Sequence, residues 1–228
     1  GRLLAPIPAP QKVICVGMNY RDHCIEQDVP IPAVPLLFGK FASAIAASGD
    51  PIPYDVRETA ELDPEVELAI VIGKGGRRID AADAPAHIAG YTVANDVSAR
   101  DLQLKSNGGQ WLLGKCGDGY APIGPSIVTA DELPTPLHLD VSCVVNGGVM
   151  QRSNTRELVH DPPSIVAYAS RFMSLVPGDI ILTGTPGGVG VFRKPPVFLK
   201  DGDVVTCEIA HIGKISNRVV EVGGRAKL

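Results

Sequence analysis

The chain has 228 residues, of which 45% are hydrophobic and 20% are charged, a composition typical of one soluble globular domain with a large core. The net charge of −4 without any basic run argues against a nucleic-acid surface, and no apolar stretch reaches the roughly 18 residues of a membrane span. We therefore expect a small-molecule partner, with no nucleic acid and no membrane.

The five cysteines are scattered and form no C-x-x-C pair, which favours a reducing compartment. No secretory signal opens the chain, so we expect a cytoplasmic protein. Because the sequence begins with Gly1 rather than Met, the alternative is the mitochondrial matrix after removal of a targeting segment.

Frequent glycines (25) and prolines (20) separate short apolar runs rich in β-branched residues, which favours many short strands over long helices. The predicted strands cover residues 13–16, 66–72, 88–94, 139–145, 179–182, 204–209 and 215–220. The predicted helices cover 20–27, 81–87, 99–105 and 163–175, and the last has apolar residues at a spacing that favours packing on a sheet. We predict a mainly β fold with a few helices (α+β), in a single domain over residues 1–228.

In the first predicted helix, His23 and Glu26 stand three residues apart, so their side chains can touch. A carboxylate that orients an imidazole is the usual general-base arrangement for activating water. The alternative is a pair on a solvated helix face. The proline-rich stretch 30–35 that follows is interpreted as a mobile loop or lid.

Three acids, Glu65, Glu67 and Asp96, lie in or next to predicted strands. Residues two apart in a strand point to the same face, so Glu65 and Glu67 can aim at one point. Two acids on one face repel each other unless a cation neutralises them, and Mg²⁺ or Ca²⁺ prefers oxygen ligands. The three carboxylates therefore predict a metal site.

Polar residues follow Asp96 in the predicted helix 99–105, for which Ser98 is the expected N-cap. Arg100 and Gln103 fall three apart on one helical face beside the metal site. A guanidinium and a carboxamide there suit recognition of a substrate carboxylate. The alternative for Arg100 is a surface ion pair.

Lys115 lies in an apolar setting that is unusual for a solvated lysine. A buried lysine next to three carboxylates and an anionic substrate can stabilise an enolate oxygen as it forms. The alternative is a structural ion pair with one of the acids.

The segment from Thr183 to Gly190 contains four glycines after an apolar strand, so its backbone is expected to approach another group closely. Its spacing matches no nucleotide-binding loop. Backbone N–H groups and Thr185 can hold a small anion there, and the alternative is a tight connection between strands.

These motifs, Asn19-Tyr20-x-Asp22-His23, Glu65-x-Glu67, Asp96-x-x-Ala99-Arg100-Asp101-x-Gln103, Trp111-x-x-x-Lys115 and Thr183-Gly184-Thr185-Pro186, together resemble the fumarylacetoacetate hydrolase family, in order and spacing from about residue 12 to 220. The resemblance implies a mixed β-roll or β-sandwich catalytic core, commonly in a homodimer. It also implies Mg²⁺, with Ca²⁺ or Mn²⁺ as alternatives, held by Glu65, Glu67 and Asp96, and no organic cofactor.

By the same resemblance, His23 and Glu26 are the catalytic dyad on a lid of about residues 19–35. Arg100, Gln103, Lys115 and Thr185 would bind the 2-oxo acid end of the substrate. The expected reaction is metal-dependent hydrolysis of a carbon–carbon bond in an acylpyruvate or a substrate like fumarylacetoacetate. The same groups can instead tautomerise or decarboxylate oxaloacetate, because metal chelation promotes enolisation. A non-catalytic metal-dependent binding module or structural oligomer is the third hypothesis.

Overall fold

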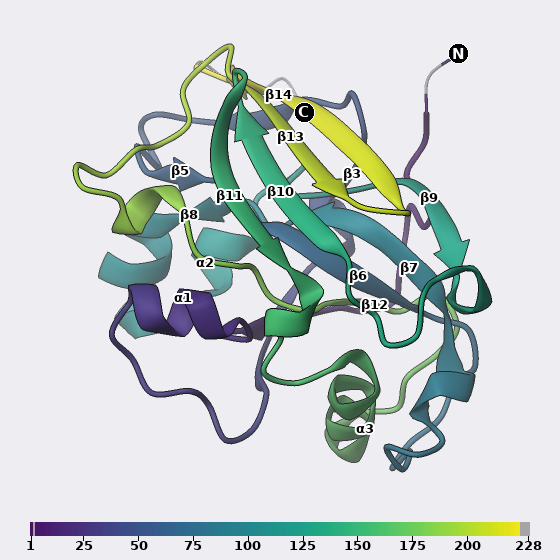
Figure 1. Ribbon diagram of the computed structural model, residues 1–228. Coiled ribbons are helices and arrows are strands. Elements are labelled where there is room, and N and C mark those ends of the chain that lie inside the picture. Colours follow the sequence, from purple (N-terminus) through teal and green to yellow (C-terminus); the bar gives the residue numbers. More distant parts are fainter. Residues whose placement is uncertain (2, 224–228) are drawn as a thin grey trace.

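The computed structural model describes residue 1 and residues 3–223, and its regular structure is mostly strands (Figure 1). The strands are β1 (Val13–Gly17), β2 (Leu36–Lys40), β3 (Ile45–Ala47), β4 (Ile52–Tyr54), β5 (Leu62–Asp63), β6 (Val66–Ile72), β7 (Ile88–Asn95), β8 (Ser98–Ala99), β9 (Ala121–Thr129), β10 (Asp140–Val145), β11 (Gly148–Asn154), β12 (Ile180–Leu182), β13 (Val204–Ile209) and β14 (Gly213–Glu221). The α-helices are α1 (Arg21–Glu26), α2 (Leu112–Lys115) and α3 (Pro162–Phe172). The predicted mainly β fold with a few helices is confirmed.

Two sheets form the body of the molecule. The larger has seven strands in the order β2-β1-β12-β6-β7-β9-β3, and the smaller has five in the order β11-β10-β13-β14-β4. In Figure 1 the yellow strands β13 and β14 lie across β6 and β7, and the main hydrophobic core lies between the two sheets. A third, two-stranded sheet pairs β5 with β8 beside the larger sheet's end.

The two-residue period of β6 separates the core from the site. Val66, Leu68 and Ile70 belong to the core between the sheets, whereas Ala69 packs on the opposite face. Glu67 lies two residues before Ala69, so both side chains point to the same face of the sheet, and Glu67 is paired with Ala94 of β7. Glu67 therefore faces away from the main core, at the end of the sheet where β7 is followed by Asp96.

Each predicted strand is present, with bounds that differ by a few residues, and α1 and α3 correspond to two of the predicted helices. Residues 81–87 form only a 3-10 turn at Ala84–His87. The helix predicted over 99–105 is wrong in its first part, because Ala99 belongs to β8 and only Asp101–Lys105 forms a turn of π-helix. Ser98 is not its N-cap, since its hydroxyl donates to the carbonyl of Asp96 at 2.9 Å.

Within the described residues, none of the helices has the length and hydropathy needed to cross a membrane.

Candidate metal centre and active site

The structure brings the carboxylates of Glu65, Glu67 and Asp96 together at the end of β6 and β7. One oxygen atom of each lies within 4.8 Å of the other two, and all three residues are buried. The backbone N–H of Asp96 donates to the carbonyl of Glu65 at 2.8 Å, which ties the residue before β6 to the residue after β7. The two adjacent strand ends thus hold the three acids in one place.

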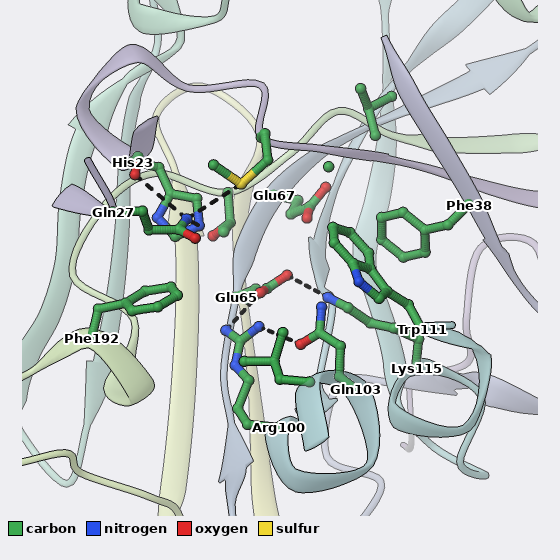
Figure 2. Close-up of a pocket in the computed structure, with 15 residues that line it drawn as sticks. His23, Gln27, Phe38, Glu65, Glu67, Arg100, Gln103, Trp111, Lys115 and Phe192 are labelled. Atoms are coloured by element: carbon green, nitrogen blue, oxygen red, sulfur yellow. Dashed lines mark hydrogen bonds and ion pairs between the residues drawn. The ribbon is translucent and has the colours of Figure 1, made fainter. Parts of the chain in front are cut away.

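Buried cations surround two of these acids. The ammonium of Lys115 lies 2.8 Å from Oε2 of Glu65, and Nη2 of Arg100 lies 2.7 Å from Oε1 of Glu65 (Figure 2). The same ammonium lies 3.0 Å from Oδ2 of Asp96. Burial opposes ionisation of Glu65, but Lys115 and Arg100 outweigh it and lower the pKa of Glu65 to about 2. The ion pair expected as the alternative role of Lys115 is therefore present, with both acids at once.

Glu67 differs from its two neighbours. No basic side chain among the described residues forms an ion pair with it; its Oε2 accepts a hydrogen bond of 2.6 Å from the backbone N–H of Gly184. Burial, together with the charges of Asp96 and Glu65, raises the pKa of Glu67 well above its usual value. A cation at the three carboxylates would offset the repulsion between their negative charges. Three convergent carboxylate oxygens also suit a hard divalent ion. The residues present therefore fit a metal ion.

Two supporting residues were missed by the sequence analysis. Lys40, at the end of β2, places its ammonium 2.7 Å from Oδ1 of Asp96. Asp63 accepts from Nε of Arg100 at 2.8 Å and from the backbone N–H of Gly190 at 2.7 Å. The sequence offered a signal for each residue. Lys40 ends an apolar run, and Asp63 lies two residues before Glu65, as Glu65 does before Glu67.

Arg100 lies in the interior rather than on the surface, so the surface ion pair considered for it is wrong. Its three guanidinium nitrogens contact Asp63, Gln103 and Glu65, and the residue is 4% exposed. The amide oxygen of Gln103 accepts from Nη1 of Arg100 at 2.8 Å, which leaves the amide nitrogen as the group able to donate to a ligand. The two residues do share one side of the pocket, as their spacing predicted.

His23 and Glu26 touch, and the imidazole is buried rather than solvated. Nδ1 of His23 lies 3.0 Å from Oε2 of Glu26, whose Oε1 accepts from the backbone N–H of Gly188 at 2.9 Å. Burial alone would raise the pKa of Glu26, but its hydrogen bonds to His23 and to the N–H of Gly188 outweigh burial, so the pKa is lowered. An ionised carboxylate only accepts, so Nδ1 of His23 carries a proton, and in the neutral imidazole Nε2 is then an acceptor. That is the tautomer a general base requires.

The glycine-rich segment binds carboxylates, but those of the protein itself. Backbone N–H groups of Gly184, Gly187, Gly188 and Gly190 donate respectively to Glu67, Asp22, Glu26 and Asp63. These N–H groups are therefore already used by carboxylates of the protein and do not bind the small external anion considered for them. The close backbone approach predicted for the glycines is confirmed at Gly188, where a Cβ would meet the carbonyl oxygen of Met150.

Thr185 lies in the same segment and lines the pocket. Its hydroxyl donates to the carbonyl of Val66 at 3.0 Å and accepts from Nε2 of Gln151 at 2.7 Å. Gln151 was missed by the sequence analysis because it comes from β11 in the smaller sheet. That Thr185 binds substrate stays a prediction, as does the lid role of residues 19–35.

Two of the three acids, Glu65 and Glu67, line one pocket together with His23 of the dyad. Figure 2 shows His23 and Gln27 on one wall, Glu65 with Arg100 and Lys115 opposite, and Phe38, Trp111 and Phe192 as aromatic walls. Nζ of Lys115 lies 5.1 Å from the centroid of the Phe38 ring, and the ring of Trp111 packs edge-on against Phe38 at 5.2 Å. The pocket therefore offers a charged floor and apolar sides to a small anion.

The comparison with known proteins agrees with these motifs. The family description "Fumarylacetoacetate (FAA) hydrolase C-terminal" matches residues 12–220. Oxaloacetate tautomerase fahd2, mitochondrial, of Xenopus laevis is 57% identical over 218 residues, which cover 96% of this chain and 68% of that protein. Oxaloacetate tautomerase FAHD2A, mitochondrial, of Homo sapiens is 55% identical over 217 residues, which cover 95% of this chain and 69% of that protein.

Solved structures share the fold. Fumarylacetoacetate hydrolase of the psychrophile Exiguobacterium antarcticum superposes with a TM-score of 0.89 at 44% identity, over 96% of this chain and 78% of that one. 5-carboxymethyl-2-hydroxymuconate delta-isomerase of Mycobacterium smegmatis gives a TM-score of 0.85 at 44% identity, over 98% and 83% of the two chains. The family and fold predicted from the motifs are confirmed: the chain belongs to the fumarylacetoacetate hydrolase family.

Proposed function

We propose that this protein is an enzyme that interconverts the keto and enol forms of oxaloacetate, with a divalent cation held by Glu65, Glu67 and Asp96. One observation carries the proposal: relatives that are 55% and 57% identical over 95% or more of the chain are named oxaloacetate tautomerases. This supports the alternative of the sequence analysis above carbon–carbon hydrolysis, which the motifs alone had put first.

The proposed cation is Mg²⁺, with Ca²⁺ or Mn²⁺ as alternatives, and no organic cofactor is needed. When bound, such an ion withdraws charge from the oxygens of a 2-oxo acid and acidifies the neighbouring carbon. Glu67 supports the assignment most directly, because it is buried without a basic partner among the described residues. Glu65 and Asp96 already share Lys115, so the site as a whole stays close to neutral when it takes up cation and anionic substrate together.

The side chains of the pocket then have separate tasks. Burial of Lys115 is outweighed by Asp96 and Glu65, which raise its pKa, so its ammonium is charged and donates to the oxygen where enolate charge develops. Arg100 and the amide nitrogen of Gln103 orient the substrate carboxylate. A proton leaves C3 of oxaloacetate to water and another is taken up by the C2 oxygen. No carbon–carbon bond breaks and no water adds.

A second candidate is hydrolysis of an acylpyruvate. The hydrogen-bonded pair of His23 and Glu26 favours it, because tautomerisation needs no activated water and hydrolysis does. In that reaction Nε2 of His23 takes a proton from water, the hydroxide adds to the distal carbonyl, and the bond from that carbonyl to C3 breaks to release an enolate.

The location and assembly of the protein are inferred on separate grounds. The names of the relatives support a mitochondrial location, which the sequence analysis gave as the alternative to the cytoplasm. The homodimer that the family resemblance implies stays a prediction, to be checked by light scattering of the purified protein.

The test uses purified protein freed of divalent ions with a chelator. Enol-oxaloacetate is followed by its ultraviolet absorbance with and without added Mg²⁺, while released pyruvate reports decarboxylation and acylpyruvate loss reports hydrolysis. Mg²⁺-dependent loss of the enol without cleavage products supports the proposal. Faster cleavage of acylpyruvate than tautomerisation rejects it in favour of the hydrolase, and binding of oxalate without any turnover restores the hypothesis of a binding module.

A further inference from the structure

The imidazole of His23 is held at both nitrogens and on one face. Glu26 occupies Nδ1 at 3.0 Å, and Nε2 of Gln27 lies 2.9 Å from Nε2 of His23. The ring of Phe192 packs against the imidazole with 5.9 Å between ring centroids. Figure 2 shows His23 and Gln27 side by side on the wall opposite Glu65. Gln27 has no part in the chemistry described above, yet it contacts the atom on which hydrolysis depends.

The direction of this hydrogen bond follows from its surroundings. The amide nitrogen of Gln27 also faces the sulfur of Met18 at 3.3 Å and the carbonyl oxygen of His23 at 3.5 Å. Both are acceptors, so the amide group must point its N–H side, and not its oxygen, toward them. Since Glu26 fixes a proton on Nδ1, Nε2 of the neutral imidazole is also an acceptor. The amide of Gln27 is therefore the donor to His23.

This arrangement determines what His23 can do. A neutral imidazole nitrogen has a single lone pair in the ring plane and accepts one hydrogen bond along it. A hydrolytic water must donate along that same direction before Nε2 can take its proton. While Gln27 donates to Nε2, the position of that water is filled.

We propose that Gln27 is a specificity-determining residue that masks the general base of the dyad, so that the pocket favours tautomerisation over hydrolysis of the same class of 2-oxo acid. Gln27 acts through His23 and is a positioning residue. The inference rests on the proposed function, because it explains why a family site with a complete dyad carries out a reaction that adds no water. Release of Gln27 from Nε2 leaves the proton transfers at C3 and the C2 oxygen unchanged.

The test removes the donor and keeps the volume. Gln27→Met retains the length of the side chain beside Met18, and Gln27→Leu serves as a second variant should the first fail to fold, as judged by thermal unfolding. Gln11→Met is the matched control, because Gln11 is exposed and bonds only its neighbour Lys12 among the described residues. Each protein is assayed with Mg²⁺ for acylpyruvate hydrolysis and for oxaloacetate tautomerisation.

We expect hydrolysis by Gln27→Met to rise about tenfold, the range that loss of one hydrogen bond gives, while tautomerisation keeps its rate. The double variant with His23→Ala should lose the whole gain. A purely structural role would change both reactions in parallel, and that outcome overturns the proposal, as does a gain that survives without His23. Failure of the proposed function shows separately, as wild-type protein that does not tautomerise oxaloacetate at all.

Discussion

Nζ of Lys40 lies 2.7 Å from Oδ1 of Asp96, and the side chains of both residues are fully buried. The same ammonium donates to the backbone carbonyls of Val97, Tyr120 and Lys115 at 3.0, 2.8 and 2.5 Å. Lys40 thus has four acceptors inside the protein for its three protons, and it joins β2 to the segment after β7. An ammonium so enclosed fixes the position of Asp96 and has no proton left for a substrate.

Replacing Lys40 should be costly for stability. Lys40→Met leaves Asp96 with one basic neighbour instead of two and leaves buried carbonyls without their donor, so we expect the free energy of unfolding to fall by about 3 kcal/mol or more. Urea denaturation measures this. Lys200→Met, at an exposed position, is the control and should leave the midpoint unchanged. A midpoint for Lys40→Met equal to that of the control would contradict the structural role.

Metal affinity should rise with pH. Because burial, Asp96 and Glu65 raise the pKa of Glu67, this carboxyl keeps its proton to higher pH than an ordinary glutamate, and the proton competes with the metal. As pH climbs through that raised pKa, the carboxylate forms and affinity increases. Calorimetric titration with Mg²⁺ in two buffers of different ionisation enthalpy should detect proton release.

Glu67→Gln provides the control for that titration, since an amide has no proton to release. It should bind Mg²⁺ more weakly and with less proton release than the wild type. Equal proton release by the two proteins would mean that another group supplies the proton.

His23 should matter for hydrolysis and not for metal binding. His23→Ala removes the acceptor Nε2, and a positioned base typically contributes about 10²–10⁴-fold, so acylpyruvate hydrolysis should fall by up to that factor. Mg²⁺ affinity should persist, because His23 contacts none of the three acids at hydrogen-bonding distance. His138→Ala, outside the pocket, is the matched control. Unchanged hydrolysis by His23→Ala would refute the assigned role.

The sequence predicted those parts of the site that depend on local spacing. Glu65 and Glu67 share a face because a strand repeats every two residues, and His23 meets Glu26 because a helix brings residues three apart together. Lys40 could not be found in this way, because its partner Asp96 lies on a separate strand end far along the chain. Contacts of that kind are set by how the sheet is assembled.

The missed strands have a similar cause. β9 contains Pro122, Gly124 and Pro125, which argue against a strand when the sequence is read alone. The structure accommodates them because the pairing of β9 with β7 shifts register between Tyr91 and Val93. At the other end of β7, Ala99 pairs with Leu62 of β5. This strand pairing keeps Ala99 extended, although the sequence pattern of residues 99–105 favours a helix.

The contact of Gly188 with Glu26 gives the last prediction. Gly188 has a φ of +101°, and a Cβ there would meet the carbonyl oxygen of Met150, so Gly188→Ala must displace the N–H that holds Glu26. Gly147 has a φ of +84° but open space around it, so Gly147→Ala carries only the backbone cost of about 1–2 kcal/mol.

Comparing the two variants separates the effect of losing the Gly188–Glu26 hydrogen bond on α1 from the effect of backbone strain. Hydrogen exchange should accelerate in the α1 amides of Gly188→Ala, because Glu26 anchors the end of that helix to the glycine-rich segment. In Gly147→Ala the α1 amides should exchange as in the wild type. If both variants leave α1 equally protected, the hydrogen bond from Gly188 to Glu26 does not anchor the helix.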